Sequence, residues 1–240
     1  MQRLRRLIGR RSSRLEEGAF VVEGPALIAE AVAAGWELEA AYLGDGAPLD
    51  LAVAGVDWHR LAPGVLERVA STETPRPVLA AVRIRTVTLE DIDKAALVVI
   101  ADRVADPGNL GTVLRSAEAA GAGAVVTTPG TVDVFNPKVV RASAGALFHV
   151  PVASAALDQL GTWGRRLLGA SSHRGTPHTE IDWSGPVAIV IGNETHGLDD
   201  DAPVTEWVRI EHHGRSESLN VAMAATLLCF EATRTRSSTR

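Results

Sequence analysis

Two short runs without a polar side chain constrain the fold of this chain more than any other feature. Residues 96–101 read ALVVIA and residues 187–191 read VAIVI. A strand with one face in water alternates apolar and polar residues, whereas a strand covered on both faces is apolar throughout. Both runs therefore predict central strands of a parallel sheet with helices on each face, which is an α/β fold.

Expected strands and helices alternate along the chain in two series. The first has strands at 20–24, 38–44, 56–62 and 77–84, and helices at 3–16, 25–35, 50–56 and 63–71. The second has strands at 96–102, 124–128, 148–152, 168–172, 187–191 and 207–211, and helices at 110–120, 136–146, 156–168 and 219–234. A polar stretch without strong periodicity separates them. We expect a small α/β domain at 1–85, a linker at 86–95 and a second domain at 96–240.

Composition excludes several classes of protein. Cys229 is the single cysteine in 240 residues, so an intramolecular disulfide and a cysteine-clustered zinc site are both excluded. No stretch approaches the ~18 apolar residues of a membrane span, and the basic N-terminus lacks the apolar region of a secretory signal. We therefore expect a protein of a reducing compartment, the cytoplasm.

Charge is distributed unevenly, although the net charge is −5. Residues 1–15 hold six arginines and no acidic residue, whereas residues 16–94 hold fourteen Asp or Glu against six Lys or Arg. A basic arm on an acidic body predicts a polyanionic partner, with a solvated helix face as the alternative. The six arginines are Arg3, Arg5, Arg6, Arg10, Arg11 and Arg14.

Three loops hold the candidate chemistry. In the first, a strand ends at Asp102, and Asn109 is placed to cap the helix that follows. Asn109, Thr112 and Arg115 then lie on one helix stripe at the carboxyl end of a parallel strand, where open α/β sheets bind ligands. An ordinary capped helix with a solvated Arg115 is the alternative.

The second loop follows the apolar strand at 187–191 and contains Gly192, Glu194 and Gly197. Glycines there allow a sharp turn or a close approach to a ligand, although a plain turn with a surface glutamate would use the same residues. In the third loop, Ser218 is expected to cap the last helix and Asn220 to face the loop. The adjacent His212 and His213 lack metal-ligand spacing.

Motifs of other α/β enzymes are absent. The sequence has no phosphate-binding G-x-x-x-x-G-K-[ST] and no G-x-S-x-G nucleophile turn. Its GAGA run at 121–124 follows a helix and precedes a strand, which is the wrong order for a dinucleotide site. Kinase, hydrolase and dehydrogenase functions are therefore disfavoured.

Taken together, the loops resemble the three signature motifs of the SpoU (TrmH-type) branch of the SPOUT RNA methyltransferases. N-x-G-x-x-x-R stands at 109–115, G-[NSA]-E-x-x-G at 192–197 and S-L-N-V at 218–221. The resemblance covers about 96–236. The segment 20–35 resembles the ribosomal-protein-like substrate-binding domain of rRNA-modifying members.

The resemblance implies S-adenosylmethionine-dependent methylation of a ribose 2′-hydroxyl in RNA, taken as 23S rRNA. It also implies a C-terminal trefoil knot near 190–225, a homodimer with an active site completed across the interface, and no metal. The family pattern gives the activation of this hydroxyl to Arg115. A guanidinium stays protonated and is a poor general base, so we expect Arg115 to donate to the developing 2′-oxyanion and to a nearby phosphate, with base action as the alternative if a neighbour perturbs it. Asn109 would fix the ribose or Arg115, and Glu194 would orient Arg115.

The remaining implied roles concern three groups of residues. Ser218 and Asn220 would hold the loop and the target nucleotide. The expected cofactor-binding residues are Thr128, Gly192, Asn193, Gly197, Ile210 and Leu219. The expected RNA-binding residues are Arg3, Arg5, Arg6, Arg10, Arg11 and Arg141.

One departure from the family pattern falls beside the cofactor site. Members often have proline and a small or apolar residue after the isoleucine, whereas Glu211, His212 and His213 follow Ile210 here. Three other functions stay open at this point: a tRNA 2′-O-methyltransferase, a non-catalytic RNA-binding module and a generic nucleotide-binding α/β enzyme. Cofactor binding separates the catalytic functions from the binding module.

Overall fold

The computed structural model describes residues 1–47, 56–66, 68–69 and 77–237. Their contacts divide into two compact units. The first contains Met1–Arg85 and Asp133–His149, and the second contains Thr86–Val132 and Val150–Arg240. The predicted helix at 50–56 falls almost wholly outside the described residues, and the described part of the one at 63–71 forms turns.

The first unit is built on a mixed four-stranded sheet with the order β1-β4-β2-β3. β4 runs antiparallel to both of its neighbours, and β2 and β3 are parallel. Its strands are β1 (Ala19–Glu23), β2 (Leu38–Leu43), β3 (Asp57–Arg60) and β4 (Val78–Arg83). Its helices are α1 (Gln2–Gly9), α2 (Arg11–Glu17), α3 (Pro25–Ala33), α5 (Pro137–Ala142) and the short 3-10 helix η2 (Ala146–Phe148).

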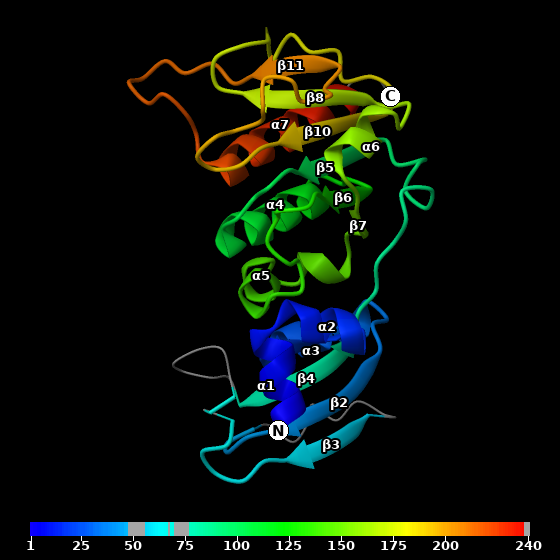
Figure 1. Ribbon diagram of the computed structural model, residues 1–240, viewed down its shortest axis with the longest axis vertical. Helices are drawn as coiled ribbons and strands as arrows, with labels where there is room; N and C mark the ends of the chain where they lie inside the picture. Colours follow the sequence, from blue (N-terminus) through cyan, green and yellow to red (C-terminus); the bar gives the residue numbers. More distant parts are fainter. Residues whose placement is uncertain (48–55, 67, 70–76, 238–240) are drawn as a thin grey trace. The chain divides into compact units, whose positions relative to one another are not determined.

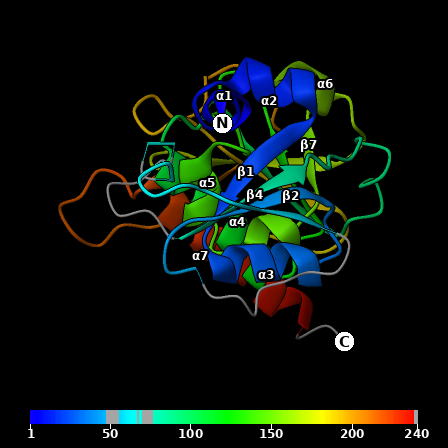
Figure 2. The same ribbon diagram turned by 90° about the horizontal axis from the view of Figure 1, so that it is seen from below.

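Both faces of β1 are buried, because successive side chains point to opposite sides of a strand. Figure 2 shows α1 and α2 on one side of these strands and α3 on the other. Leu4 and Leu7 of α1 pack in one cluster with Val21. On the other face, Phe20 contacts the Trp36 ring edge-on at 5.9 Å between centroids.

The basic N-terminal segment is part of this unit rather than an extended arm. It forms α1 and α2, which contribute buried side chains to the unit. Arg14 is itself buried, pairs with Asp133 at 2.6 Å and donates to the Leu7 carbonyl. The sequence showed the arginines but could not show the acidic residues that face them.

The second unit has a seven-stranded sheet in which every neighbouring pair is parallel, which confirms the predicted fold class. The strand order is β7-β6-β5-β10-β8-β11-β9. The strands are β5 (Leu97–Ala101), β6 (Ala124–Thr127), β7 (Val152–Ser154), β8 (Arg166–Ser171), β9 (Thr176–Pro177), β10 (Val187–Ile191) and β11 (Glu206–Arg209). The helices are α4 (Pro107–Ala119), α6 (Leu157–Gly161) and α7 (Val221–Ser237).

β5 and β10 lie side by side near the middle of this sheet, and all ten of their residues are buried. α4 and α7 contact each other and the strands, and Figure 1 shows both helices beside β5 and β10. The other face, which includes Ile100 and Val190, packs with Leu160 of α6 and with Ile92. The apolar runs are therefore covered on both sides, as the sequence predicts.

Some boundaries differ from those expected. The polar stretch 86–95 packs on the second unit, where Ile92 joins the core. Residues 133–149 group with the first unit because α5 packs on β1. α6 ends at Gly161 and β8 follows in place of the rest of the helix expected at 156–168. The knot stays a prediction.

No helix in the described part of the chain is long and apolar enough to cross a membrane.

The burial of α1 generates a prediction for stability. Leu7 is fully buried, whereas Leu15 of α2 has 62% of its surface exposed. Leu7→Ala should lower the free energy of unfolding by about 2–5 kcal/mol, because it leaves a cavity in the core. Urea denaturation measures the loss, and Leu15→Ala is the matched control with little expected effect. Equal stabilities of the two variants would show that α1 is not part of the core.

Candidate functional site

Three loops of the second unit meet at the carboxyl ends of its central strands. The Asn109 amide nitrogen donates to Glu194 Oε1 at 3.1 Å, and the Asn220 amide nitrogen donates to Asn109 Oδ1 at 2.9 Å. One residue from each sequence motif therefore enters a single hydrogen-bonded chain. Each of the two hydrogen bonds joins residues more than 80 positions apart in sequence, so the sheet and the helix pair α4–α7 bring them together.

Glu194 is the acceptor on which this arrangement converges. Its carboxylate accepts from the backbone N–H groups of Asp106 at 2.9 Å and Ala105 at 3.1 Å, besides the Asn109 amide. Burial alone would raise the pKa of Glu194, but these hydrogen bonds outweigh it and hold the pKa below its usual value. Glu194 is therefore an ionised acceptor at neutral pH and has no proton to donate.

The helix caps differ from the predicted ones, in each case by a short shift. Asp106, not Asn109, caps α4, and its carboxylate accepts from the Asn109 backbone N–H at 2.8 Å. Asn220, not Ser218, precedes α7 and accepts from the backbone N–H of Ala222 at 2.9 Å. In both cases a motif side chain is not used as the helix cap. The Asn109 amide is then free to donate to Glu194, and Ser218 lies in the loop before α7.

The second motif forms a tight turn after β10. Asn193 and Gly197 pair through two backbone hydrogen bonds of 3.1 and 2.9 Å. A Cβ atom at Gly192 would lie 2.2 Å from the carbonyl carbon of Gly197, so only glycine fits there. The Asn193 side chain is used inside the turn, where its Oδ1 accepts from the Thr195 backbone N–H at 2.9 Å.

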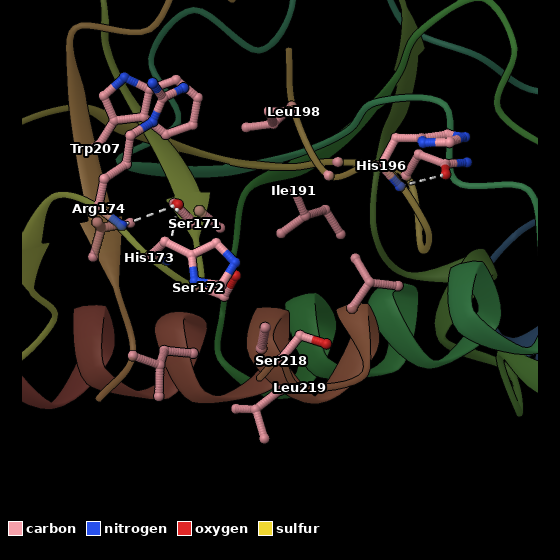
Figure 3. Close-up of a pocket in the computed structure, with 18 of the residues that line it drawn as sticks. Ser171, Ser172, His173, Arg174, Ile191, His196, Leu198, Trp207, Ser218 and Leu219 are labelled. Carbon is pink, nitrogen blue, oxygen red and sulfur yellow. Dashed lines mark hydrogen bonds between the residues drawn. The ribbon is translucent and has the colours of Figure 1, made fainter. Parts of the chain in front are cut away.

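A pocket of about 480 Å³ opens beside this turn. Its walls come from the segments that follow β8, β10 and β11 and from the beginning of α7. Figure 3 shows Ser218 and Leu219 on the α7 side, with Ile191 and Leu198 on the strand side. A location outside the carboxyl ends of parallel strands is the usual ligand site of an open α/β sheet.

Most of the predicted cofactor residues line this pocket. Five of the six do so, namely Gly192, Asn193, Gly197, Ile210 and Leu219. Thr128 does not: it is buried, and its hydroxyl donates to Asp102 Oδ1 at 2.7 Å and accepts from the Arg103 backbone N–H. Of the predicted catalytic residues, Glu194 and Ser218 also line the pocket.

Arg115 stands apart from these contacts. It is exposed on α4, and Glu194 contacts Asn109 and the loop backbone instead of Arg115. Within the described ranges no carboxylate lies at ion-pair distance from Arg115. Thr112 of the same stripe donates to the Gly108 carbonyl inside its own helix, at 2.9 Å. The guanidinium is therefore exposed to solvent and free of the hydrogen-bonded chain that joins the three motifs.

The predicted RNA-binding arginines fall into two groups in the first unit. Arg3, Arg6 and Arg141 form ion pairs with acidic residues of the same unit: Arg3 with Glu17 and Glu39, Arg6 with Glu17, and Arg141 with Glu23. Arg5, Arg10 and Arg11 are exposed, and no ion pair links them to the described residues. Arg6 is exposed as well, so what distinguishes these three is that they are exposed and without an ion pair to the described residues.

Two further groups at the site were missed by the sequence reasoning. Arg174 lies over the Trp207 ring at 3.6 Å from its centroid and pairs with Asp200, and all three line the pocket. Arg103 follows β5 in the left-handed region, with φ of 53°. No local pattern distinguishes either arginine from a solvated one.

Arg103 joins the loops around the site. Its side chain pairs with Asp102 and Asp199, both at 2.9 Å, and its carbonyl accepts from the Asn193 amide at 3.0 Å. The hydrogen bond from the Arg103 guanidinium to Asp199 raises the pKa of the guanidinium most, and the hydrogen bond to Asp102 raises it further. A non-glycine residue persists in a left-handed conformation where surrounding contacts determine it.

The fold and the site define a class: a parallel α/β enzyme domain with a ligand pocket between glycine- and asparagine-containing loops. Comparison with known proteins agrees. Residues 96–230 match the model of the SpoU rRNA Methylase family, and residues 1–80 match the MRM3-like substrate binding domain. The chain belongs to the SpoU rRNA methylase family.

Relatives and solved structures match nearly the whole chain. It is 34% identical to the 23S rRNA (guanosine(2553)-2'-O)-methyltransferase RlmP of Bacillus subtilis, over 92% of this chain and 90% of that protein. It is 32% identical to a 23S rRNA (uridine(2479)-2'-O)-methyltransferase of Streptomyces viridochromogenes, over 100% and 91%. The crystal structure of the SpoU methyltransferase AviRb from Streptomyces viridochromogenes with AdoMet superposes with a TM-score of 0.88 at 30% identity, covering 100% and 98% of the two chains.

The conformation of Arg103 generates a prediction. Arg103→Gly and Arg103→Ala both remove the ion pairs, but only glycine adopts a positive φ without steric cost. The glycine variant should therefore be more stable than the alanine variant by about 1 kcal/mol. Thermal unfolding of the two variants measures this difference. An alanine variant at least as stable as the glycine variant would show that the left-handed conformation stores no strain.

Proposed function

We propose that this protein transfers the methyl group of S-adenosylmethionine to a ribose 2′-hydroxyl of 23S rRNA. The observation that carries the proposal is the chain Asn220–Asn109–Glu194, which joins all three motifs at the edge of the pocket. The relatives named above support the reaction and the RNA class, and the AdoMet complex of AviRb supports the cofactor.

The pocket fits such a cofactor. Sites for ligands of this size are concave, have volumes of roughly 300–1,000 Å³ and combine apolar walls with a few polar groups. Here the apolar side chains include Ile191, Ile210 and Leu219, and the turn from Gly192 to Gly197 adds backbone polar groups. The bound cofactor supplies an activated methyl group on sulfur. The protein therefore has to position the ribose and support its oxygen.

The roles of the side chains follow from their contacts. Glu194 is saturated with N–H donors and ionised, so it holds the loops of the first and second motifs together. Asn109 and Asn220 set the relative positions of α4 and α7. Ser218 lines the pocket, and its hydroxyl is the group that we assign to the ribose of the target nucleotide. Arg115 donates to the 2′-oxygen as its charge develops, since a guanidinium stays protonated.

A homodimer would bring Arg115 into a pocket. Met223, Leu227 and Phe230 are exposed at 53, 45 and 48% and follow one face of α7, at positions i, i+4 and i+7. Ser116, the neighbour of Arg115, contacts Thr226 of α7 at 2.6 Å. This contact holds the Ser116 turn of α4 against the part of α7 that carries the apolar stripe. In the proposed dimer a second copy covers the stripe and receives Arg115 at its own site, which is compatible with the exposure of Arg115 in the single chain.

The activity itself is tested with purified protein, labelled S-adenosylmethionine, and 23S rRNA or tRNA. We expect label in 23S rRNA, recovered after nuclease digestion as a 2′-O-methyl nucleoside. Label in tRNA alone would show that the substrate is tRNA and not 23S rRNA. Cofactor binding without transfer to either RNA would favour a non-catalytic RNA-binding module.

Arg115→Ala should lower methyl transfer about 10²–10³-fold, because a donor to the developing oxyanion is removed. The affinity for S-adenosylmethionine should stay unchanged, since Arg115 does not line the pocket of its own chain and is assigned to the ribose oxygen rather than to the cofactor. Single-turnover transfer and calorimetric titration measure the two effects. Glu118→Ala, exposed on the same helix, is the control. Near wild-type turnover in Arg115→Ala would remove this residue from the mechanism.

Met223→Asp combined with Leu227→Asp should convert the dimer to a monomer and abolish transfer, because charges replace the apolar stripe. Sedimentation measures the mass, with Leu15→Asp as a control on an exposed leucine outside α7.

The shared site has its own test: a mixture of Arg115→Ala and Glu194→Ala subunits should recover activity that neither variant has alone. Mixed dimers without any recovery would place Arg115 in the pocket of its own subunit.

Replacement of Arg5, Arg10 and Arg11 by glutamine should weaken RNA binding and its dependence on salt. For every arginine that neutralises a phosphate, its removal should make the log–log salt slope shallower by roughly 0.7–0.9. Deleting residues 1–14 would instead remove the buried Leu4 and Leu7, so substitution is the cleaner test. RNA titrations from low to high salt measure the slope, with cofactor affinity as the control. An unchanged slope would assign these arginines to a solvated face.

A further inference from the structure

His212 lies in the pocket at the point where the sequence departs from the family pattern. Val208, Ile210 and His212 all line the pocket, whereas Arg209 and Glu211 do not. That alternation is expected of extended backbone, in which every second side chain points to the same side. The imidazole therefore continues the apolar wall formed by Val208 and Ile210.

The Nε2 atom of His212 is buried, and no described residue hydrogen-bonds to it. A buried polar atom without a partner is unfavourable, and such atoms in folded proteins require an explanation. A ligand in the pocket can provide the missing partner. Three other side chains have a comparable atom, but Arg165, His178 and Arg209 do not line the pocket. His212 alone among the four combines both properties.

The chemistry of the surrounding wall indicates which part of a ligand His212 meets. Val208, Ile210 and Leu219 form an apolar surface that suits a purine. Arg174 and Asp200 also line the pocket, but their charged groups pair with each other at 3.0 Å and are not part of this apolar surface. An imidazole nitrogen at the end of an apolar wall can exchange a hydrogen bond with a ring nitrogen, an exocyclic amine or a ribose hydroxyl.

We infer that His212 Nε2 hydrogen-bonds the adenosine part of the bound cofactor and contributes to the selection of this nucleoside. The inference rests on the proposed function, because it takes S-adenosylmethionine as the ligand. His212 binds the ligand and takes no part in methyl transfer. Loss of its side chain should therefore affect binding of the cofactor and of its adenosine fragments alike.

The test uses two variants of the full-length protein. His212→Leu retains apolar bulk and removes the nitrogen, and His212→Gln places an amide near the position of Nε2. Calorimetry with S-adenosylhomocysteine should give a Kd raised about 2- to 10-fold by leucine, the effect of removing one hydrogen bond, and restored in part by glutamine. Methylthioadenosine, which lacks the amino-acid part, should show the same ratio between leucine variant and wild type.

Stability without ligand separates a binding role from a structural one. His212→Leu removes an unpartnered buried atom, so its melting temperature without ligand should equal or exceed that of the wild type. Unchanged affinity for S-adenosylhomocysteine in His212→Leu would overturn the inference. It would also be overturned if His212→Leu lowered the melting temperature without ligand and His212→Gln lost as much affinity as His212→Leu. An effect on S-adenosylhomocysteine but not on methylthioadenosine would overturn the adenosine assignment.

The experiment includes a replacement variant and a binding control with wild-type protein. If His212→Leu does not fold, His212→Met, which also lacks the nitrogen, replaces it with the same expected outcomes. Wild-type protein that binds neither ligand would overturn the proposed cofactor itself. That result is distinct from normal wild-type binding with an insensitive His212, which would overturn only the inference about this side chain.

Discussion

The carboxylate of Glu194 is the interaction on which the site depends. Backbone N–H groups in a loop lack the partners that a helix or sheet provides, and Glu194 accepts from two of them, those of Ala105 and Asp106, just before α4. It accepts from the Asn109 amide as well. Because these donors favour the charged form, the carboxylate is fixed in place rather than left to exchange protons with a substrate.

The central strands make that interaction possible. β5 and β10 are adjacent and parallel, so the loops that follow them leave the sheet at the same edge. Glu194 stands three residues after β10, and its two backbone donors stand four and five residues after β5. A turn as tight as the one between Gly192 and Gly197 keeps the carboxylate close to the strand end. The burial that stabilises the sheet therefore also determines the geometry of the loops.

Much of this could be predicted from sequence because it depends on periodicity. The runs around Val98 and Val190 are apolar on both faces, and this pattern correctly predicted a covered parallel sheet. The motifs singled out Asn109, Glu194 and Asn220, but the contact expected for Glu194 was with Arg115, whereas the structure joins Glu194 to Asn109 and Asn109 to Asn220. Local patterns were weaker for caps: Asp106 and Asn109 can both cap a helix, and only the rest of the fold decides between them.

Features that depend on distant partners could not be predicted in the same way. The arginines of α1 looked like a free basic arm, but Arg3 meets Glu39 across the first unit. Thr128 follows a strand, as residues that bind ligands often do, yet its hydroxyl donates a hydrogen bond to Asp102 within the protein. In both cases the deciding partner lies 25 or more positions away, and a single sequence contains no signal for that pairing.

The position of Arg115 bears on how the 2′-hydroxyl is activated. A guanidinium carries its proton throughout the ordinary pH range, so it can donate hydrogen bonds but has no free lone pair with which to accept a proton. In its own chain Arg115 is exposed and stands apart from Glu194, whose carboxylate is committed to the Asn109 amide and two backbone N–H groups. Within the proposed mechanism, the arginine therefore acts as a charged donor to the oxygen. Its proton stays in place, and the proton of the hydroxyl leaves to solvent or to the RNA.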